Sequence, residues 1–97
     1  MRIIAVSTLK KYWETHREVE QPLRAWCYEV EHAEWRSSHD VVRHYPYSDP
    51  IGDNRVVFNI KGNHNRLVVK IHYNTKVVYI RFIGTHEEYD RINAEMI

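Results

Sequence analysis

One stretch decides the fold of this chain, and it reads RVVFNIKGNHNRLVVKIHYNTKVVYIRFIGT over residues 55–85. Apolar and polar side chains alternate through it in three runs, which are interrupted at residues 62–65 and 74–75. Alternation with a period of two is the pattern of a strand with one buried face, and breaks rich in Asn and Gly are typical of hairpin turns. The stretch therefore predicts a three-stranded antiparallel meander.

The two breaks also predict the register of the meander. A two-residue turn at 74–75 pairs Tyr73 with Lys76 and, further along, Leu67 with Phe82. A four-residue turn at 62–65 pairs Lys61 with Arg66. One face of the sheet is then apolar, and the other face carries the polar set Arg55, Asn59, Lys61, Arg66, Lys70, His72, Tyr79 and Arg81. A slip by one residue would bury the cations of this set, so the two faces are strongly specified.

The segment before the meander supplies a cover for the apolar face. Residues 2–6, which include the apolar run 3–6, predict a short first strand, and apolar residues at helical spacing predict a helix that Ser7 or Thr8 caps. A second helix is expected from Pro22 to near Trp35, because proline suits a first helical turn. We expect both helices to pack on the sheet.

Two further segments complete the expected fold. Residues 36–53 contain three breakers and read as mostly loop, with one short turn of helix that Ser38 caps. The sequence Thr85-His86-Glu87-Glu88 is a capping box that opens a short final helix. The sequence thus predicts an α+β fold in a single domain over residues 1–97.

Composition excludes several classes of protein. The chain has 97 residues, of which 43% are hydrophobic and 28% charged, as in an ordinary globular domain. The lone Cys27 leaves no internal disulfide and no Cys-rich zinc site, and it lies on the apolar stripe of the second expected helix. The seven histidines lack metal-ligand spacing, so we expect no metal and no cofactor. Without a signal peptide or an apolar run of about 18 residues, we expect a cytoplasmic protein with no membrane contact.

Positive charge is concentrated in the meander. Residues 54–86 hold six of the 14 Lys and Arg side chains and none of the 13 Asp and Glu side chains. Cations fixed on a rigid sheet are suited to binding phosphates, and Tyr79 among them offers a ring on which a base could stack. The alternative is an ordinary solvated sheet surface, although such surfaces usually mix the two signs.

Two residues after the meander suggest proton transfer. His86 and Tyr89 lie three apart in the final helix and follow Arg81 closely, so they can overhang the basic face. Histidine is the residue most often used for proton transfer near neutral pH. The alternative is that His86 is merely a helix-start residue and Tyr89 a core residue.

Several motifs resemble one known family. Residues 55–63 (RVVFNIKGN), 66–69 (RLVV) and 79–90 (YIRFIGTHEEYD) resemble the HigB toxins of bacterial toxin–antitoxin pairs, as does EQPLRAW at 20–26. The order of strand, two helices, antiparallel meander and short helix is similar to the RelE/ParE superfamily to which these toxins belong. One difference lies in the turn, where His64 and Asn65 replace the Lys or Asp and the Tyr that the family often has before the arginine.

The resemblance implies an mRNA interferase, which is an endoribonuclease that cuts messages on the ribosome and inhibits translation. It implies a HigA-type antitoxin with a helix-turn-helix domain as partner, and contact with operator DNA only through that antitoxin. Carried over by position, it implies functional roles for Lys61, Asn63, Arg66, Arg81, His86 and Tyr89. From their places on the basic face or its turn we add Arg55, His64, Lys70 and Tyr79 as RNA-binding residues.

The residues allow a metal-free mechanism that uses the 2′-OH of the substrate as nucleophile. Arg66 and Arg81 would stabilise the charge on phosphorus, because guanidinium binds phosphate through paired hydrogen bonds. His86 is the preferred acid or base, Lys61 is an alternative base, and Tyr89 would orient the phosphate or hydroxyl. Two other functions stay open at this point: a ParE-like toxin that binds DNA gyrase without cutting RNA, and a degenerate member that only binds antitoxin.

Overall fold

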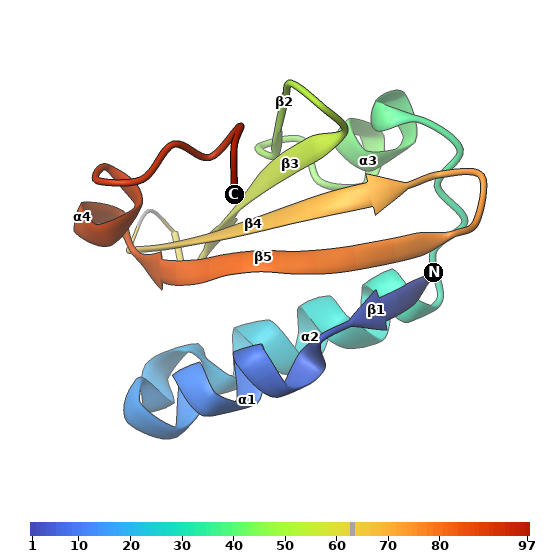
Figure 1. Cartoon of the computed structure of the whole chain (residues 1–97). Coiled ribbons are helices and arrows are strands. Elements are labelled where there is room, and N and C mark those ends of the chain that lie inside the picture. Colours follow the sequence, from blue (N-terminus) through green and yellow to red (C-terminus); the bar gives the residue numbers. More distant parts are fainter. Residues whose placement is uncertain (63) are drawn as a thin grey trace.

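The computed structural model describes residues 1–62 and 64–97 (Figure 1). The chain forms an α+β fold with a mixed sheet, as the sequence predicted. Its elements, in order, are β1 (Arg2–Ile4), α1 (Val6–Thr15), the 3-10 turn η1 (Arg17–Val19), α2 (Glu20–Glu31), α3 (Ser38–His44), β2 (Asp49–Ile51), β3 (Arg55–Ile60), β4 (Asn65–His72), β5 (Val77–Thr85) and α4 (His86–Tyr89).

The sheet has five strands in the order β1-β5-β4-β3-β2. The predicted meander β3–β4–β5 forms its centre, and β1 joins β5 in parallel at one edge. The expectation of loop between residues 36 and 53 is wrong at β2, which pairs antiparallel with β3 at the other edge. A three-residue strand with Pro50 at its centre has no alternation to detect, and an edge strand is the place where a sheet tolerates proline.

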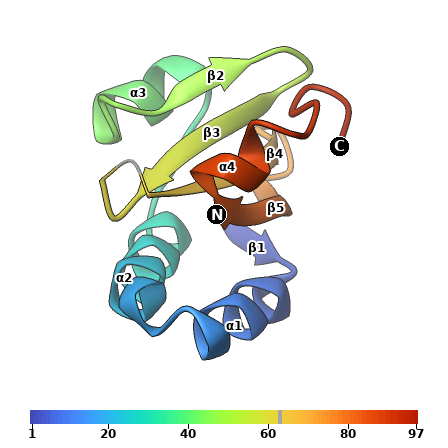
Figure 2. The same ribbon diagram turned by 90° about the vertical axis from the view of Figure 1, so that its left-hand side faces the viewer.

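The helices cover one face of the sheet. In Figures 1 and 2, α1 and α2 lie together below the sheet, on the side away from α4. Their buried side chains join the inward side chains of the meander in one core, to which α3 adds Val41. Cys27 belongs to this core, and burial raises the pKa of its thiol to about 11. The second helix ends at Glu31, before the expected Trp35, but the Trp35 ring is buried in the same core.

The register between β3 and β4 differs from the predicted one by two residues. The strands pair Ile60 with Asn65 and Phe58 with Leu67, so the prediction that Lys61 pairs with Arg66 is wrong. The turn therefore begins at residue 61, one residue earlier than expected. A two-residue slip keeps every side chain on its face, so the hydrophobic pattern could not distinguish the two registers.

The register between β4 and β5 is the predicted one up to Ile80, and a β-bulge then shifts it. Val69 pairs with Ile80, but Val68 pairs with Phe82, so Arg81 is the extra residue. Leu67 consequently faces Ile83, and its predicted pairing with Phe82 is wrong. An extra residue reverses the alternation after it, which turns Phe82 to the polar face and Ile83 to the core.

The second face of the sheet is not fully open to solvent. After α4 the chain turns back over this face toward β3 (Figure 1). Val57 and Val68 on this face are buried, and Arg55 is only 6% exposed. The Arg55 guanidinium donates through Nε to the Ile97 carbonyl at 2.7 Å and through Nη1 to Asp53 at 2.7 Å. The predicted exposure of Arg55 is therefore wrong.

The predicted capping box at the start of α4 is confirmed. The Glu88 amide donates to the Thr85 hydroxyl at 3.2 Å, and the Glu88 carboxylate accepts from the Thr85 amide at 2.8 Å. These two bonds satisfy N–H groups that have no partner inside a helix. They hold α4 at a defined angle to β5, and so they fix the position of His86.

We expect Thr85→Ala to destabilise α4 locally by about 1 kcal/mol. The backbone hydrogen bond from Thr85 is the main cause that lowers the pKa of Glu88. Because this pKa is lower in the folded state, the contribution is complete above the unfolded pKa and is lost as pH falls through the folded value. The protection of the α4 amides, which is the intrinsic exchange rate at each pH divided by the observed rate, should therefore decrease in the wild type as pH falls into the acid range. In Thr85→Ala, which loses the hydroxyl acceptor but keeps the amide that donates to Glu88, this protection should be lower than in the wild type already at neutral pH, whereas protection in β4 should be unchanged.

Candidate functional site

One end of the sheet gathers most of the residues that the sequence singled out. The turn after β3, the start of β4, the end of β5 and α4 all meet there, and Figure 2 looks onto this end. Asn65 pairs with Thr85, and the His86 amide donates to the His64 carbonyl at 3.0 Å. An open groove of about 700 Å³ lies here, lined by His16, Glu18, His64, Asn65, Thr85, His86, Glu87 and Asp90.

His86 is held in this groove by a carboxylate. Its Nδ1 atom lies 2.9 Å from Oδ2 of Asp90, which is one helical turn further along the chain. Both side chains are about half exposed, at 49% and 58%. A carboxylate on one ring nitrogen orients the imidazole and leaves Nε2 as the nitrogen for proton transfer. Sequence reasoning missed Asp90, although the spacing of four between His86 and Asp90 was a readable signal.

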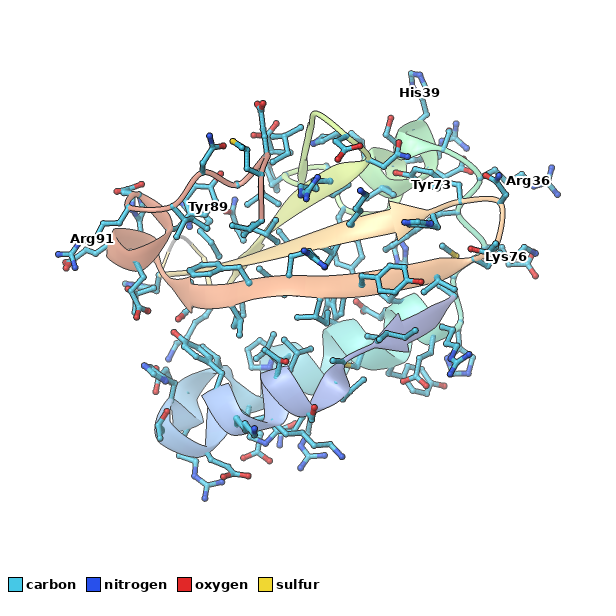
Figure 3. The ribbon with its side chains drawn as sticks, in the orientation of Figure 1. Arg36, His39, Tyr73, Lys76, Tyr89 and Arg91 are labelled. Carbon is cyan, nitrogen blue, oxygen red and sulfur yellow. The ribbon has the colours of Figure 1, made fainter. Side chains whose placement is uncertain are left out.

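Arg66 and Tyr89 form a second pair at the same end of the sheet, outside the lining of the groove. The guanidinium carbon of Arg66 lies 6.0 Å from the centre of the Tyr89 ring, a cation–π distance. Figure 3 shows Tyr89 on the side of the sheet away from α1 and α2. Arg66 pairs with Gly84, only two residues before His86. Arg66, Tyr89 and His86 thus lie at the same end of the sheet, but only His86 belongs to the lining of the groove.

Arg81 lies on the same face but further from His86. It is exposed at the bulge of β5, four residue steps before Thr85. At about 3.3 Å per residue, these four steps place Arg81 roughly 13 Å along the strand from Thr85, the residue before His86. The expected convergence of Arg81 with Arg66 and His86 on a single phosphate is therefore not seen in the strand positions. Lys61 is exposed in the turn after β3, next to the groove.

Three other predicted RNA-binding residues lie away from the groove: Lys70 and Tyr79 are toward the opposite end of the sheet, and Arg55 is buried. Lys70 Nζ lies 3.2 Å from the Asp53 carboxylate, which also binds the buried Arg55. Tyr79 lies opposite Lys70, and its ring packs edge-on against His72 at 5.0 Å. Asp53 immediately precedes the acid-free stretch, and its pKa is lowered by Arg55 and Lys70. The cationic face is therefore smaller than the sequence implied, because one carboxylate neutralises part of it.

The turn itself is described in part. His64 contributes to the groove, as expected for a residue placed at the turn. The predicted contact Asn63 lies outside the described residues. Among the residues that the structure describes, no group of three or more His, Cys, Asp or Glu side chains could hold a metal ion.

A partly buried hydrogen bond connects α1 to Asn65, one of the residues that line the groove. The Tyr12 hydroxyl of α1 donates to Oδ1 of Asn65 at 2.6 Å, and Asn65 is 3% exposed. The Tyr12 ring stacks on His16 with a centroid distance of 4.0 Å. The first helix is thereby tied to the start of β4. Tyr12 and Asn65 were not predicted as site residues, because their contact joins positions 53 residues apart.

We expect Tyr12→Phe to lower the free energy of unfolding by about 1–3 kcal/mol, because it leaves the buried Asn65 oxygen without its donor. Burial, followed by the charges of Glu88 and Glu18, raises the pKa of Tyr12 to about 12. Since the folded pKa lies above the unfolded one, this contribution is complete below about pH 10 and is lost as pH rises toward 12. Urea unfolding at pH 7 measures the loss. The same change at the 88% exposed Tyr47, as Tyr47→Phe, should have no effect on stability.

Comparisons with known proteins identify the family of the chain. In the described part of the chain, no helix combines the length and apolar character that crossing a membrane requires. A comparison with curated proteins found no significant match. Residues 19–92, well over half of the chain, match the family model for HigB toxins, the RelE-like toxic component of a toxin–antitoxin system. The comparison does not favour the gyrase-binding alternative. An antitoxin is the partner that such a system implies, and by this match the chain belongs to the HigB toxin family.

Proposed function

We propose that the chain is an mRNA interferase, a metal-independent endoribonuclease that cuts messages on the ribosome and so stops translation and growth. The observation that carries this proposal is the pair His86–Asp90 in an open groove, at the end of the sheet where the pair Arg66–Tyr89 also lies. A toxin that only docked on a target would not need an imidazole oriented by a carboxylate within an open groove.

The reaction we propose uses the substrate's own 2′-OH. This oxygen loses its proton and attacks the adjacent phosphorus, and the 5′-oxygen of the next nucleotide leaves with a proton. His86 carries one of these protons through Nε2, and Asp90 stabilises the imidazolium that forms when the ring accepts it. Lys61 in the neighbouring turn, or Tyr89, carries the other.

Charge develops on the phosphate oxygens during the attack, and Arg66 is the cation placed to offset it. A fixed donor at such a position commonly contributes about 3–4 kcal/mol to the transition state. The Tyr89 ring lies within cation–π distance of the guanidinium, at 6.0 Å, and favours this position of Arg66. Arg81, roughly four strand steps away, binds a neighbouring phosphate and fixes the direction of the RNA.

The partners follow from the same proposal. A HigA-type antitoxin with a helix-turn-helix domain binds this toxin in the cytoplasm, blocks access of messenger RNA and the ribosome to the groove, and brings the toxin to operator DNA. The toxin itself needs no DNA contact, because the antitoxin domain supplies it.

The test is to induce the toxin in growing cells and map the 5′ ends of messages by primer extension, with a second reaction on purified ribosomes. We expect new ends within coding regions soon after induction, and the same ends on purified ribosomes. Growth arrest with intact messages would contradict the proposal. If double-strand breaks in DNA accumulated instead, the protein would be a gyrase toxin.

A further inference from the structure

A second hollow lies beside the turn that follows β3, and the proposed reaction does not use it. It has a volume of about 460 Å³, which is within the range of small-ligand sites. It forms where β2 has ended but β3 continues, because β2 pairs only with Arg55 to Val57. The loop after α3 closes its outer side, so that its walls include His44, Tyr45, Tyr47, Phe58, Asn59 and Gly62.

The walls of this hollow suit a flat ring with a polar edge. Tyr47 is 88% exposed, so its ring is accessible to a ligand. The Tyr45 ring behind it packs edge-on against Phe58 at 5.2 Å, and its hydroxyl donates to Glu29, so this wall is fixed. Asn59 is exposed, and its Nδ2 atom donates to the Tyr47 carbonyl at 3.4 Å. Aromatic faces combined with a carboxamide are the means by which proteins bind unpaired bases.

The place of the hollow also fits a polynucleotide. Gly62 belongs to its lining and His64 belongs to the lining of the groove beside His86, so the two depressions flank the same short turn. Lys61 lies in that turn and is exposed. None of the described residues that line the hollow is acidic. A strand with one phosphate in the groove could therefore pass Lys61 and present a neighbouring base to the hollow.

We propose that this hollow binds one nucleobase of the RNA substrate, with the base stacked on Tyr47 and its edge hydrogen-bonded to Asn59. The inference rests on the proposed function for the identity of the polymer, but it does not require that the polymer be cut. The competing occupant is an apolar side chain of the antitoxin, and the experiment below separates the two.

The probe is a short single-stranded RNA made of 2′-O-methyl nucleotides, one of which carries the fluorescent base 2-aminopurine. It has no free 2′-OH and cannot be cleaved by the proposed reaction. We expect the wild-type protein to quench the fluorescence by stacking. Tyr47→Ala should abolish the quenching and weaken binding about tenfold, since one stacked base contributes on that order. Tyr47→Phe, which keeps the ring, should bind and quench as the wild type does.

Tyr28→Ala is the matched control, because Tyr28 is also strongly exposed, at 66%, but lies on α2. It should change neither quenching nor affinity. If Tyr47→Ala quenches and binds the probe like the wild type, the inference is wrong. If that variant instead loses affinity for the antitoxin, the hollow is a protein-docking site. Wild-type protein that quenches normally but never cuts RNA would contradict the proposed nuclease activity and leave the base site supported.

Discussion

His86→Ala should reduce RNA cleavage by a factor of about 10² to 10⁴, the usual contribution of a positioned acid or base. The side chain is about half exposed, and its side-chain partner in the structure is Asp90 at the surface, so its removal should leave the fold intact. Single-turnover cleavage of a message on purified ribosomes measures the effect directly. In cells, the same variant should no longer arrest growth.

His39→Ala is the matched control for this prediction. His39 is an exposed histidine of α3, and Figure 3 places it at the far end of the molecule from Tyr89. It should cleave at the wild-type rate. Asp90→Asn keeps a hydrogen-bonding group beside the ring but removes the charge, and it should therefore reduce cleavage less than His86→Ala does. Full activity of a folded His86→Ala protein would refute the assignment of the site.

Phe58→Ala should lower the free energy of unfolding by about 3–5 kcal/mol. The Phe58 ring is 2% exposed and contacts the rings of Trp26, Trp35 and Tyr45 at centroid distances of 5.4, 6.2 and 5.2 Å. Its removal leaves a cavity at the junction of α2, α3 and β3. Small domains are typically stable by only about 5–15 kcal/mol, so the loss is a large fraction of the total.

Urea unfolding followed by tryptophan fluorescence measures this loss. Tyr47→Ala removes an aromatic ring from the neighbouring loop, but that ring is 88% exposed, so the midpoint should change little. This control also establishes that the variant used to test the base-binding hollow is folded. A Phe58→Ala protein with the wild-type midpoint would show that the core does not depend on this ring.

Much of the fold could be predicted because its signals are local. The alternation in residues 55–80 specified which side chains face the core, even where the register was wrong by two, but the bulge reversed the faces of Phe82 and Ile83. The capping box needed only Thr85 and Glu88, which are three apart in sequence. The bulge at Arg81 could not be predicted, since an extra residue is compatible with either alternation until its partner strand is known.

The candidate site was predictable only as a set of residues. The sequence indicated Arg66, His86 and Tyr89, and the structure brings them to one end of the sheet. The sequence also indicated Arg55 and Lys70, but in the structure the Asp53 carboxylate forms an ion pair with each of them. A count of charges along the chain has no information on such pairing, because it depends on distances in space.

The sequence by itself determined the two faces of the meander as far as the bulge in β5, the start of the last helix and the kinship of the chain with the HigB toxins. These features depend on residue types and on spacings of two to four positions, which the sequence alone provides. Tertiary structure alone decided which cations stay exposed, that Tyr12 supports Asn65 from a helix far away in sequence, and that a hollow forms beyond the end of β2. Each of these depends on contacts between distant segments, and the position of such contacts is set by how the strands and helices pack together.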